Sequence, residues 1–245
     1  MALQYIFAQP DYIEGIDKDN PITIYPITLK DHDKFQECSK LLYISKKHFE
    51  ENSYPLLALV FMSYQQFDMS QEELIENLCL LFSMVTNRVV NFFQSENSDG
   101  FLLDDDNIIS VQNYEDVRAI IMRQNLMFEQ KIYKTELMNK WAAKALLSKQ
   151  KNASNISMED VISTVSVGCS KHYYDLQNYT MYQIYSDFYR LRKTINYDSS
   201  IQFKCAGSDL TLEDYAESLD LFHNPYDDLF VSSDKLTGLN KAIKK

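Results

Sequence analysis

The sequence predicts an α+β protein that is mainly helical, with about seven helices and a small β-sheet or hairpin. Three observations favour this class. Glycine and proline number only five each among 245 residues, so we expect long elements joined by few tight turns. Apolar residues recur at helical spacing through most of the chain. Longer runs that are typical of strands occur in two places, near the N-terminus and at residues 89–111.

The N-terminal region is expected to lead from an arm into an edge strand and then a helix. Residues 1–21 form the predicted arm, with a short strand at Gln4–Phe7. Ile22–Leu29 alternates apolar and polar residues, and Pro26 confines that strand to an edge or a bulge because proline donates no backbone hydrogen bond. Asp31 can cap the helix that follows, whose apolar positions are Phe35, Cys38, Leu41 and Leu42.

Two buried helices and a hairpin are predicted next. Pro55 is expected to open a helix that runs through Tyr64. Ser70 caps the helix Gln71–Asn87, and Glu73, three residues on, completes a capping box. Two β-rich runs at 89–111 flank a turn that contains Asp-Gly, which predicts a hairpin that joins the N-terminal strand in one small sheet.

The second half of the chain is expected to be helical apart from one short strand. Asn113 can cap Tyr114–Asn125, in which Val117, Ile120 and Ile121 are apolar. A helix is predicted at 134–151, with Leu137, Trp141, Ala145 and Leu146 on one side. A helix at Met158–Cys169 and a long helix after Thr180 follow. The last predicted elements are a strand Ile201–Cys205 and a helix from Thr211 to Phe222 with Asp214 in its first turn.

These elements are expected to form one continuous unit at residues 22–223, with a candidate boundary between two lobes near residue 112. Residues 1–21 remain an arm. Residues 224–245 are polar, end in a lysine-rich stretch and are expected to be a flexible tail.

Charge and composition indicate which partners to expect. The formal net charge of -11 repels a phosphate backbone, so no nucleic-acid binding is predicted. The longest apolar run, Pro55–Met62, is too short to span a membrane, and Met1–Pro10 lacks the basic region of a signal peptide. Four widely separated cysteines are typical of reduced thiols in an intracellular protein. We therefore expect a soluble protein of the cytoplasm that makes no membrane contact.

No catalytic residue, metal ligand or cofactor is predicted, because no nucleotide-binding, metalloprotease or hydrolase motif is present. Asp104–Asp106, with Asp99 and Asn107, is the strongest metal candidate, but its spacing does not match an EF-hand loop and a charged hairpin edge explains it. Cys169 and His172 are three residues apart, as in one corner of a zinc site or in a Cys–His dyad. No second ligand pair accompanies them, which favours an ordinary helix end.

The strongest binding candidates lie on the helix after Thr180. Tyr182, Tyr185 and Tyr189 share one stripe, and Arg190 and Arg192 follow at its basic end. One interpretation is a wide core-facing side with cations that complement the helix dipole. The other is a protein interface, in which tyrosine, arginine and tryptophan are enriched. On the second interpretation the candidate protein-binding residues are Tyr182, Tyr185, Tyr189, Arg190, Arg192 and Trp141.

Several segments resemble, in order, the tail assembly chaperone-like proteins of phages that infect low-GC Gram-positive bacteria. The residues that carry the resemblance are DNIISVQNYEDVRAIIMRQN (Asp106–Asn125), a lysine-rich helix at Trp141–Lys151, SMEDVISTVS (Ser157–Ser166) and NYTMYQIYSDFYRLRK (Asn178–Lys193). The resemblance spans about residues 20–220 and rests on helical patterns. It implies a non-enzymatic, self-associating protein of the bacterial host cytoplasm that binds the tape-measure or tail-tube protein while a phage tail is built.

Two other functions fit the same residues. A structural virion component, such as a baseplate or neck protein, would stay in the finished particle. An acidic phage-encoded inhibitor of a host protein complex would bind one host protein, and its association would depend on salt.

Overall fold

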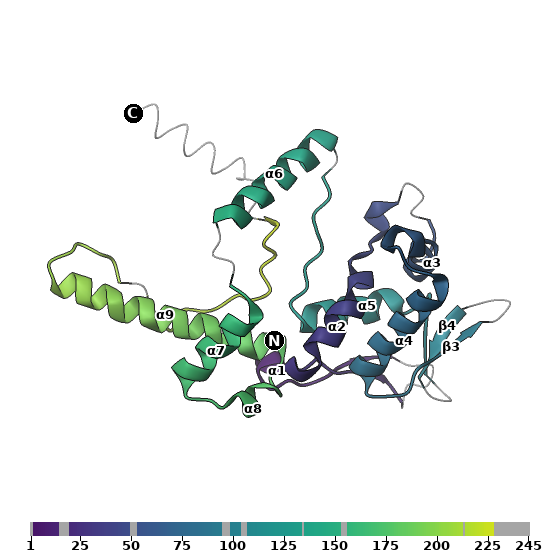
Figure 1. The fold of residues 1–245 in the computed structure, drawn as a ribbon, viewed down its shortest axis with the longest axis horizontal. Helices are drawn as coiled ribbons and strands as arrows, with labels where there is room; N and C mark the ends of the chain where they lie inside the picture. The colour runs from purple at the N-terminus through teal and green to yellow at the C-terminus, as the bar shows by residue number, and fades with distance from the viewer. Residues whose placement is uncertain are drawn as a thin grey trace.

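The computed structural model describes residues 2–14, 20–49, 53–94, 99–103, 107–133, 135–152, 156–212 and 214–227. In these residues the chain forms nine α-helices and two antiparallel sheets, of two and three strands (Figure 1). The predicted class, α+β and mainly helical, is confirmed. Two of the helices, α1 (Ala2–Ile6) and α8 (Tyr173–Leu176), are short and were not predicted.

The larger hydrophobic core lies in the N-terminal lobe, which we define as β1 to α5. Four helices build it: α2 (His32–Ser39), α3 (Leu56–Met62), α4 (Gln71–Thr86) and α5 (Tyr114–Gln124). Apolar side chains at helical spacing meet at the centre of the lobe, and the fully buried ones include Leu41, Leu57, Leu74, Leu78, Leu81, Phe82 and Tyr114. The apolar side of α4 therefore faces this core.

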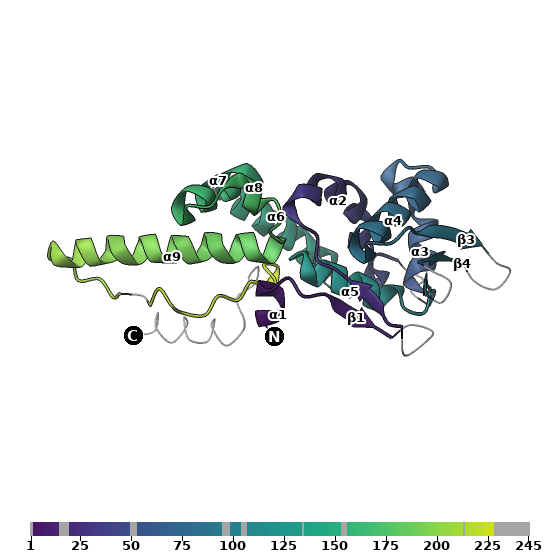
Figure 2. The same cartoon turned by 90° about the horizontal axis from the view of Figure 1, so that it is seen from below.

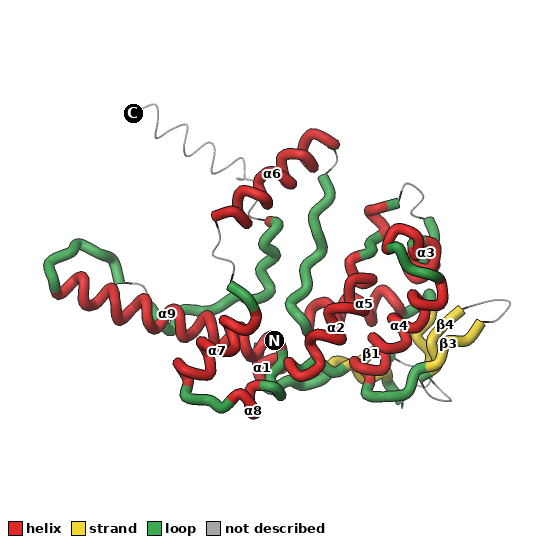
Figure 3. The backbone as a smooth tube through the Cα atoms, viewed as in Figure 1, coloured by secondary structure: helices red, strands yellow, loops and turns green. Residues whose placement is uncertain are grey.

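The strands form two separate sheets in this lobe (Figure 3). β1 (Asp11–Ile13) pairs with β2 (Ile22–Ile24), with Tyr12 opposite Thr23. β3 (Asn91–Gln94), β4 (Asp99–Leu102) and β5 (Ile108–Ser110) form the other sheet. The hairpin is confirmed, but the single sheet with the N-terminal strand was wrong. The edge of β2 is already occupied by β1, and beyond it Tyr25 donates its backbone N–H to the Val85 carbonyl.

The predicted strand at Gln4–Phe7 was also wrong, because those residues belong to α1 and the turn after it. The backbone N–H of Phe7 donates to the Leu3 carbonyl, and the buried ring of Tyr5 packs against Tyr182. A five-residue segment carries too little periodicity to separate helix from strand, and this tertiary contact decides between them.

Capping residues mark the helix starts, although not always through the side chain. Ser70 and Glu73 form the predicted capping box at α4, with the Glu73 backbone N–H 3.1 Å from the Ser70 Oγ. Asn113 precedes α5 as predicted, but its Oδ1 accepts from the Ser110 N–H at 2.8 Å and so closes the end of β5. Asp31 stands at the start of α2 without a side-chain bond to the helix backbone.

The C-terminal lobe, which we define as α7 to α9, contains a second and smaller core. α7 (Met158–Cys169) packs against α9 (Met181–Cys205), and the buried residues between them and α8 are Val161, Val165, Leu176, Ile184 and Phe188. α6 (Glu136–Asn152) stands apart from both lobes (Figure 1). The predicted domain limits and the lobe boundary near residue 112 stay predictions.

Two C-terminal predictions were wrong. Ile201–Cys205 is the last part of α9, because the helix that the Thr180–Gln183 capping box opens meets no glycine or proline before residue 207. Residues 211, 212 and 214–222 form turns and extended chain in place of a helix, and this segment returns along α9 (Figure 2). The guanidinium group of Arg190 binds the carbonyls of Tyr215 and Glu217 and so holds the segment beside α9.

Some sequence predictions fall outside the described residues. They concern the acidic cluster Asp104–Asp106 and the tail beyond residue 227. Among the residues that are described, no helix is long and apolar enough to cross a membrane.

Candidate functional site

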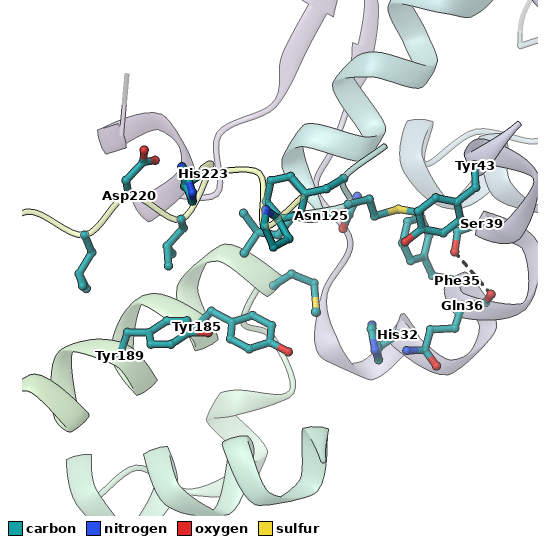
Figure 4. A pocket seen from close by; sticks show the side chains of 17 residues that line it. His32, Phe35, Gln36, Ser39, Tyr43, Asn125, Tyr185, Tyr189, Asp220 and His223 are labelled. Carbon is teal, nitrogen blue, oxygen red and sulfur yellow. Dashed lines mark hydrogen bonds between the residues drawn. The ribbon is translucent and has the colours of Figure 1, made fainter. Parts of the chain in front are cut away.

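An open groove of about 590 Å³ lies where the N-terminal lobe meets the start of α9 (Figure 4). Four segments far apart in the sequence line it: α2 and the turn after it, the loop that follows α5, one face of α9 and the returning segment at 219–225. Among the described lining residues there is no lysine or arginine, and Asp220 is their single carboxylate. The groove is therefore a mostly apolar surface on a strongly acidic chain.

Regular helical spacing places the lining side chains of α2. His32, Phe35, Gln36 and Ser39 follow one another at the i, i+3, i+4 and i+7 positions, so they share one face. The charged residues Asp33, Lys34 and Glu37 lie on the exposed remainder of the helix. α2 thus turns an uncharged face toward the groove.

α9 contributes a second uncharged stripe, Met181, Tyr185 and Tyr189, at i, i+4 and i+8. The rings of Tyr185 and Tyr189 stack with their centroids 6.1 Å apart. Burial raises the pKa of the half-buried Tyr185. Tyr189 is 39% exposed and stands at the open side of the groove. These two predicted binding residues are brought together at the groove.

Tyr182 lies elsewhere. It is buried, its ring is 5.6 Å from that of Tyr5, and it stacks on Phe222 at 5.4 Å. The guanidinium group of Arg123 lies 5.4 Å from the centroid of Phe222 and completes this cluster. The face of α9 that meets the groove runs through Met181, and Tyr182 belongs to the adjoining packed face.

The two predicted arginines contact the chain itself. Arg190 donates to the backbone carbonyls of the returning segment, at 2.6 Å for Tyr215. The Arg192 guanidinium group lies 5.6 Å from the ring centroid of Phe188. Neither arginine is a lining residue of the groove. Their roles in binding stay a prediction.

Trp141 is on α6 and is 60% exposed, and Leu137 one turn earlier is 65% exposed. The Lys144 ammonium group lies 5.9 Å from the indole centroid. The predicted apolar side of α6 is therefore open to solvent along much of its length, while Ala142 is buried. Trp141 does not line the groove of its own chain.

His32 and Asn125 are among the polar groove residues that were not predicted. His32 is buried, and neither of its ring nitrogens has a hydrogen-bonding partner among the described residues. Burial lowers the pKa of His32, which favours the neutral ring. Asn125 is also buried, and its Nδ2 donates to the Ile121 carbonyl at 2.8 Å while its Oδ1 has no partner in the described chain. Helical spacing with Phe35 was the one sequence signal for His32.

The loop after α5 completes this wall. Leu126 adopts a left-handed conformation with φ of 53°, which ends α5 and redirects the chain. Met127 is then held by a backbone bond to the Met122 carbonyl, and Met127 and Phe128 line the groove. A methionine in such a wall adapts to partners of different shapes.

The candidates for chemistry are not gathered at this groove. Cys169 is exposed at the end of α7, and His172 precedes α8 across the turn. In the described part of the chain, no group of three or more histidine, cysteine, aspartate or glutamate residues is placed to hold a metal ion.

Comparison with known proteins gives two matches. Residues 148–220, which span the end of α6 to the returning segment, match the family described as YomV second domain. The chain is also 23% identical over 115 residues to the SPbeta prophage-derived uncharacterized protein YomV of Bacillus subtilis (strain 168). That alignment covers 47% of this chain and 48% of the relative, so the chain spans about half the length of the curated relative it matches. No solved structure matches.

Proposed function

We propose that this chain is a phage-encoded, non-catalytic protein-binding factor that serves as a tail assembly chaperone in the host cytoplasm. Its similarity to a prophage-derived protein supports a phage origin. The observation that carries the binding role is the groove, which two uncharged helical stripes help to line and whose described lining residues include no lysine or arginine. Grooves of this kind receive the apolar face of an amphipathic helix.

The exposed side of α6 supports the same role. Leu137 and Trp141 are both more than half exposed and lie one turn apart. Neighbouring large apolar side chains on a surface mark sites where proteins meet, and tryptophan is enriched among residues that dominate binding energy. The chain thus offers two uncovered apolar surfaces, a concave one and a convex one.

A tail protein such as the tape measure or the tail tube suits these surfaces as client. A long helix-rich chain exposes apolar stripes until its partners assemble around it, and a chaperone that covers them reversibly prevents aggregation. Repeated weak contacts along such a chain add up to a strong but dissociable complex. The function needs no metal, cofactor or catalytic residue.

The test is affinity capture of the tagged chain from infected cells, with mass spectrometry of the captured proteins and of the purified particles. The proposal predicts recovery of a long helical tail protein and absence of the chain from finished particles. The Tyr189→Ala variant should recover less of that protein. Tyr174→Ala is the matched control, because Tyr174 is 78% exposed on α8 and does not line the groove.

Two results would contradict the proposal. Presence of the chain in finished particles would identify a structural virion component such as a baseplate or neck protein. Recovery of a single host protein, with capture that weakens as salt is added, would identify an inhibitor of a host complex.

A further inference from the structure

The groove contains buried hydrogen-bonding atoms that its own chain leaves without a partner. The Oδ1 of Asn125 accepts, and a neutral His32 ring offers one accepting and one donating nitrogen. Buried polar groups in folded proteins are nearly always hydrogen-bonded, so two such side chains lining one groove point to a ligand that supplies a hydrogen bond there. That ligand needs a hydrogen-bond donor on an otherwise apolar body.

The chain itself carries such a group on α6. Its single tryptophan is Trp141, whose indole is apolar apart from one N–H that only donates. Trp141 is exposed, and Leu137 extends the same apolar side by one turn. Figure 1 shows α6 standing clear of both lobes, so a second molecule can reach this side.

The charges of the two surfaces are also complementary. α6 contains four lysines and one glutamate, although the whole chain has a net charge of -11. The described lining of the groove has the Asp220 carboxylate and no lysine or arginine. Two copies of this acidic chain repel each other in most orientations. The repulsion is weakest when the lysine-rich α6 of one copy faces the groove of the other.

We propose that α6 of a second copy binds in the groove of the first. Trp141 of the second copy then inserts against Asn125 and His32. The inference deepens the proposed function and rests on it, since it assigns the groove an occupant and makes the chaperone a self-associating protein. This contact covers both apolar surfaces in the free chaperone, so a client competes with α6 for the groove, and a long client with repeated apolar stripes binds many copies.

Tryptophan fluorescence tests the binding of α6 in the groove directly. The chain has one tryptophan, so the tryptophan emission reports only the surroundings of Trp141. The proposal predicts emission typical of an exposed indole in dilute full-length protein, and a shift to shorter wavelength as concentration and sedimentation coefficient rise together. Emission and mass that do not change with concentration would overturn it. A short-wavelength emission already present in the dilute monomer would also overturn it, because α6 would then occupy its own groove.

Complementary variants identify the two sides of the contact. Trp141→Ala keeps the groove and removes the inserted ring. Tyr189→Ala with Asp220→Asn keeps α6 and alters exposed groove residues, and asparagine retains an acceptor for the backbone N–H of Phe222. Far-ultraviolet circular dichroism confirms that each variant is folded. Each alone should sediment as a monomer, and an equimolar mixture should form a one-to-one dimer through the single intact contact.

Other results of this mixing experiment would overturn the inference. A mixture that stays monomeric would show that α6 and the groove are not partners, and a variant that still associates like the wild type would show that its altered surface is not used. Tyr174→Ala should associate like the wild type. Trp141→Phe, which keeps a ring but loses the N–H, should associate more weakly than the wild type and more strongly than Trp141→Ala.

The two proposals fail in different ways. If the wild type and the mixture of variants show no self-association but affinity capture still recovers a tail protein, the proposed binding of α6 in the groove is wrong and the chaperone function stands. If the chains associate as described but capture recovers no tail protein, the proposed function is wrong.

Discussion

At the scale of single residues, the polar groups that matter most are buried ones whose bonding is incomplete. His32 and Asn125 face the groove, whereas the Tyr114 hydroxyl is enclosed in the N-terminal core without a hydrogen-bonding partner in the described chain. Burial raises the pKa of Tyr114 strongly, so the phenol stays neutral. The Tyr114 hydroxyl is expected to cost folding free energy permanently, because no partner can reach the core. His32 and Asn125 line the groove, where a bound partner can supply a hydrogen bond.

Tyr114→Phe should leave the free energy of unfolding unchanged or raise it by up to about 2 kcal/mol. The substitution keeps the ring that packs against Phe82 and removes an unsatisfied buried hydroxyl. Urea denaturation followed by circular dichroism measures this. Tyr114→Ala is the control and should lose about 3–5 kcal/mol through the cavity it leaves. A clear loss of stability in Tyr114→Phe would show that the hydroxyl does have a partner.

His32 should make the fold less stable in mild acid. Its pKa is lowered in the folded state, so below the unfolded value of about 6.5 the unfolded chain binds a proton that the folded chain resists. Above that pH both states are neutral and the difference vanishes. The free energy of unfolding should therefore fall less between pH 7.5 and 5.5 in His32→Gln than in the wild type. Equal pH dependence in the two proteins would contradict this account.

At the scale of elements, the sequence predicts helices well where a capping box precedes an apolar stripe. The boxes at Ser70, Ser157 and Thr180 each stand at the start of a helix in the structure. Short or late segments were predicted less well. Residues 201–205 continue a helix because no glycine or proline interrupts it. Residues 214–222 are not helical, and Arg190 holds them through the carbonyls of Tyr215 and Glu217, a tertiary contact that local sequence does not indicate.

The packing of α7 on α9 depends on Gly168. A Cβ atom added there would lie 2.2 Å from the Leu191 Cδ2, so Gly168→Ala forces the Leu191 side chain or the helices to move. We expect a loss of about 1–3 kcal/mol in the free energy of unfolding. Leu191→Ala removes the obstructing atoms, and the double variant should lose less than the two single losses combined. Additive losses in a double-mutant cycle would contradict this close contact.

At the scale of the whole molecule, the groove exists because four distant segments meet. Tyr185 and Tyr189 could be predicted from the stripe on α9, but the sequence does not show that residues 32–43, 125–128 and 219–225 lie opposite them. Asn125 follows an ordinary helix end, and no local pattern indicates that its Oδ1 faces a groove. Tertiary contacts made by single residues therefore decide the site, and local spacing predicts only its separate stripes.

Phe222 is expected to hold the returning segment in place as one wall of the groove. Its ring contacts Tyr5 at 4.9 Å and Tyr182 at 5.4 Å, which joins residues from both ends of the chain. Phe222→Ala should speed proteolysis and amide hydrogen exchange within residues 206–227 while global unfolding changes little. Faster hydrogen exchange across α9 as well would show that the returning segment stabilises the whole C-terminal lobe.

The central claim is that this protein works by binding other proteins at the groove. A photo-cross-linking amino acid in place of Tyr189, irradiated in infected cells, tests it most directly. The account predicts cross-links to α6 of a second copy and to a tail protein, which compete for the groove, and far fewer cross-links from the same group in place of Tyr174. Equal, sparse cross-linking at the two positions would contradict the claim, since the groove would then be no more a meeting place for proteins than an ordinary exposed surface.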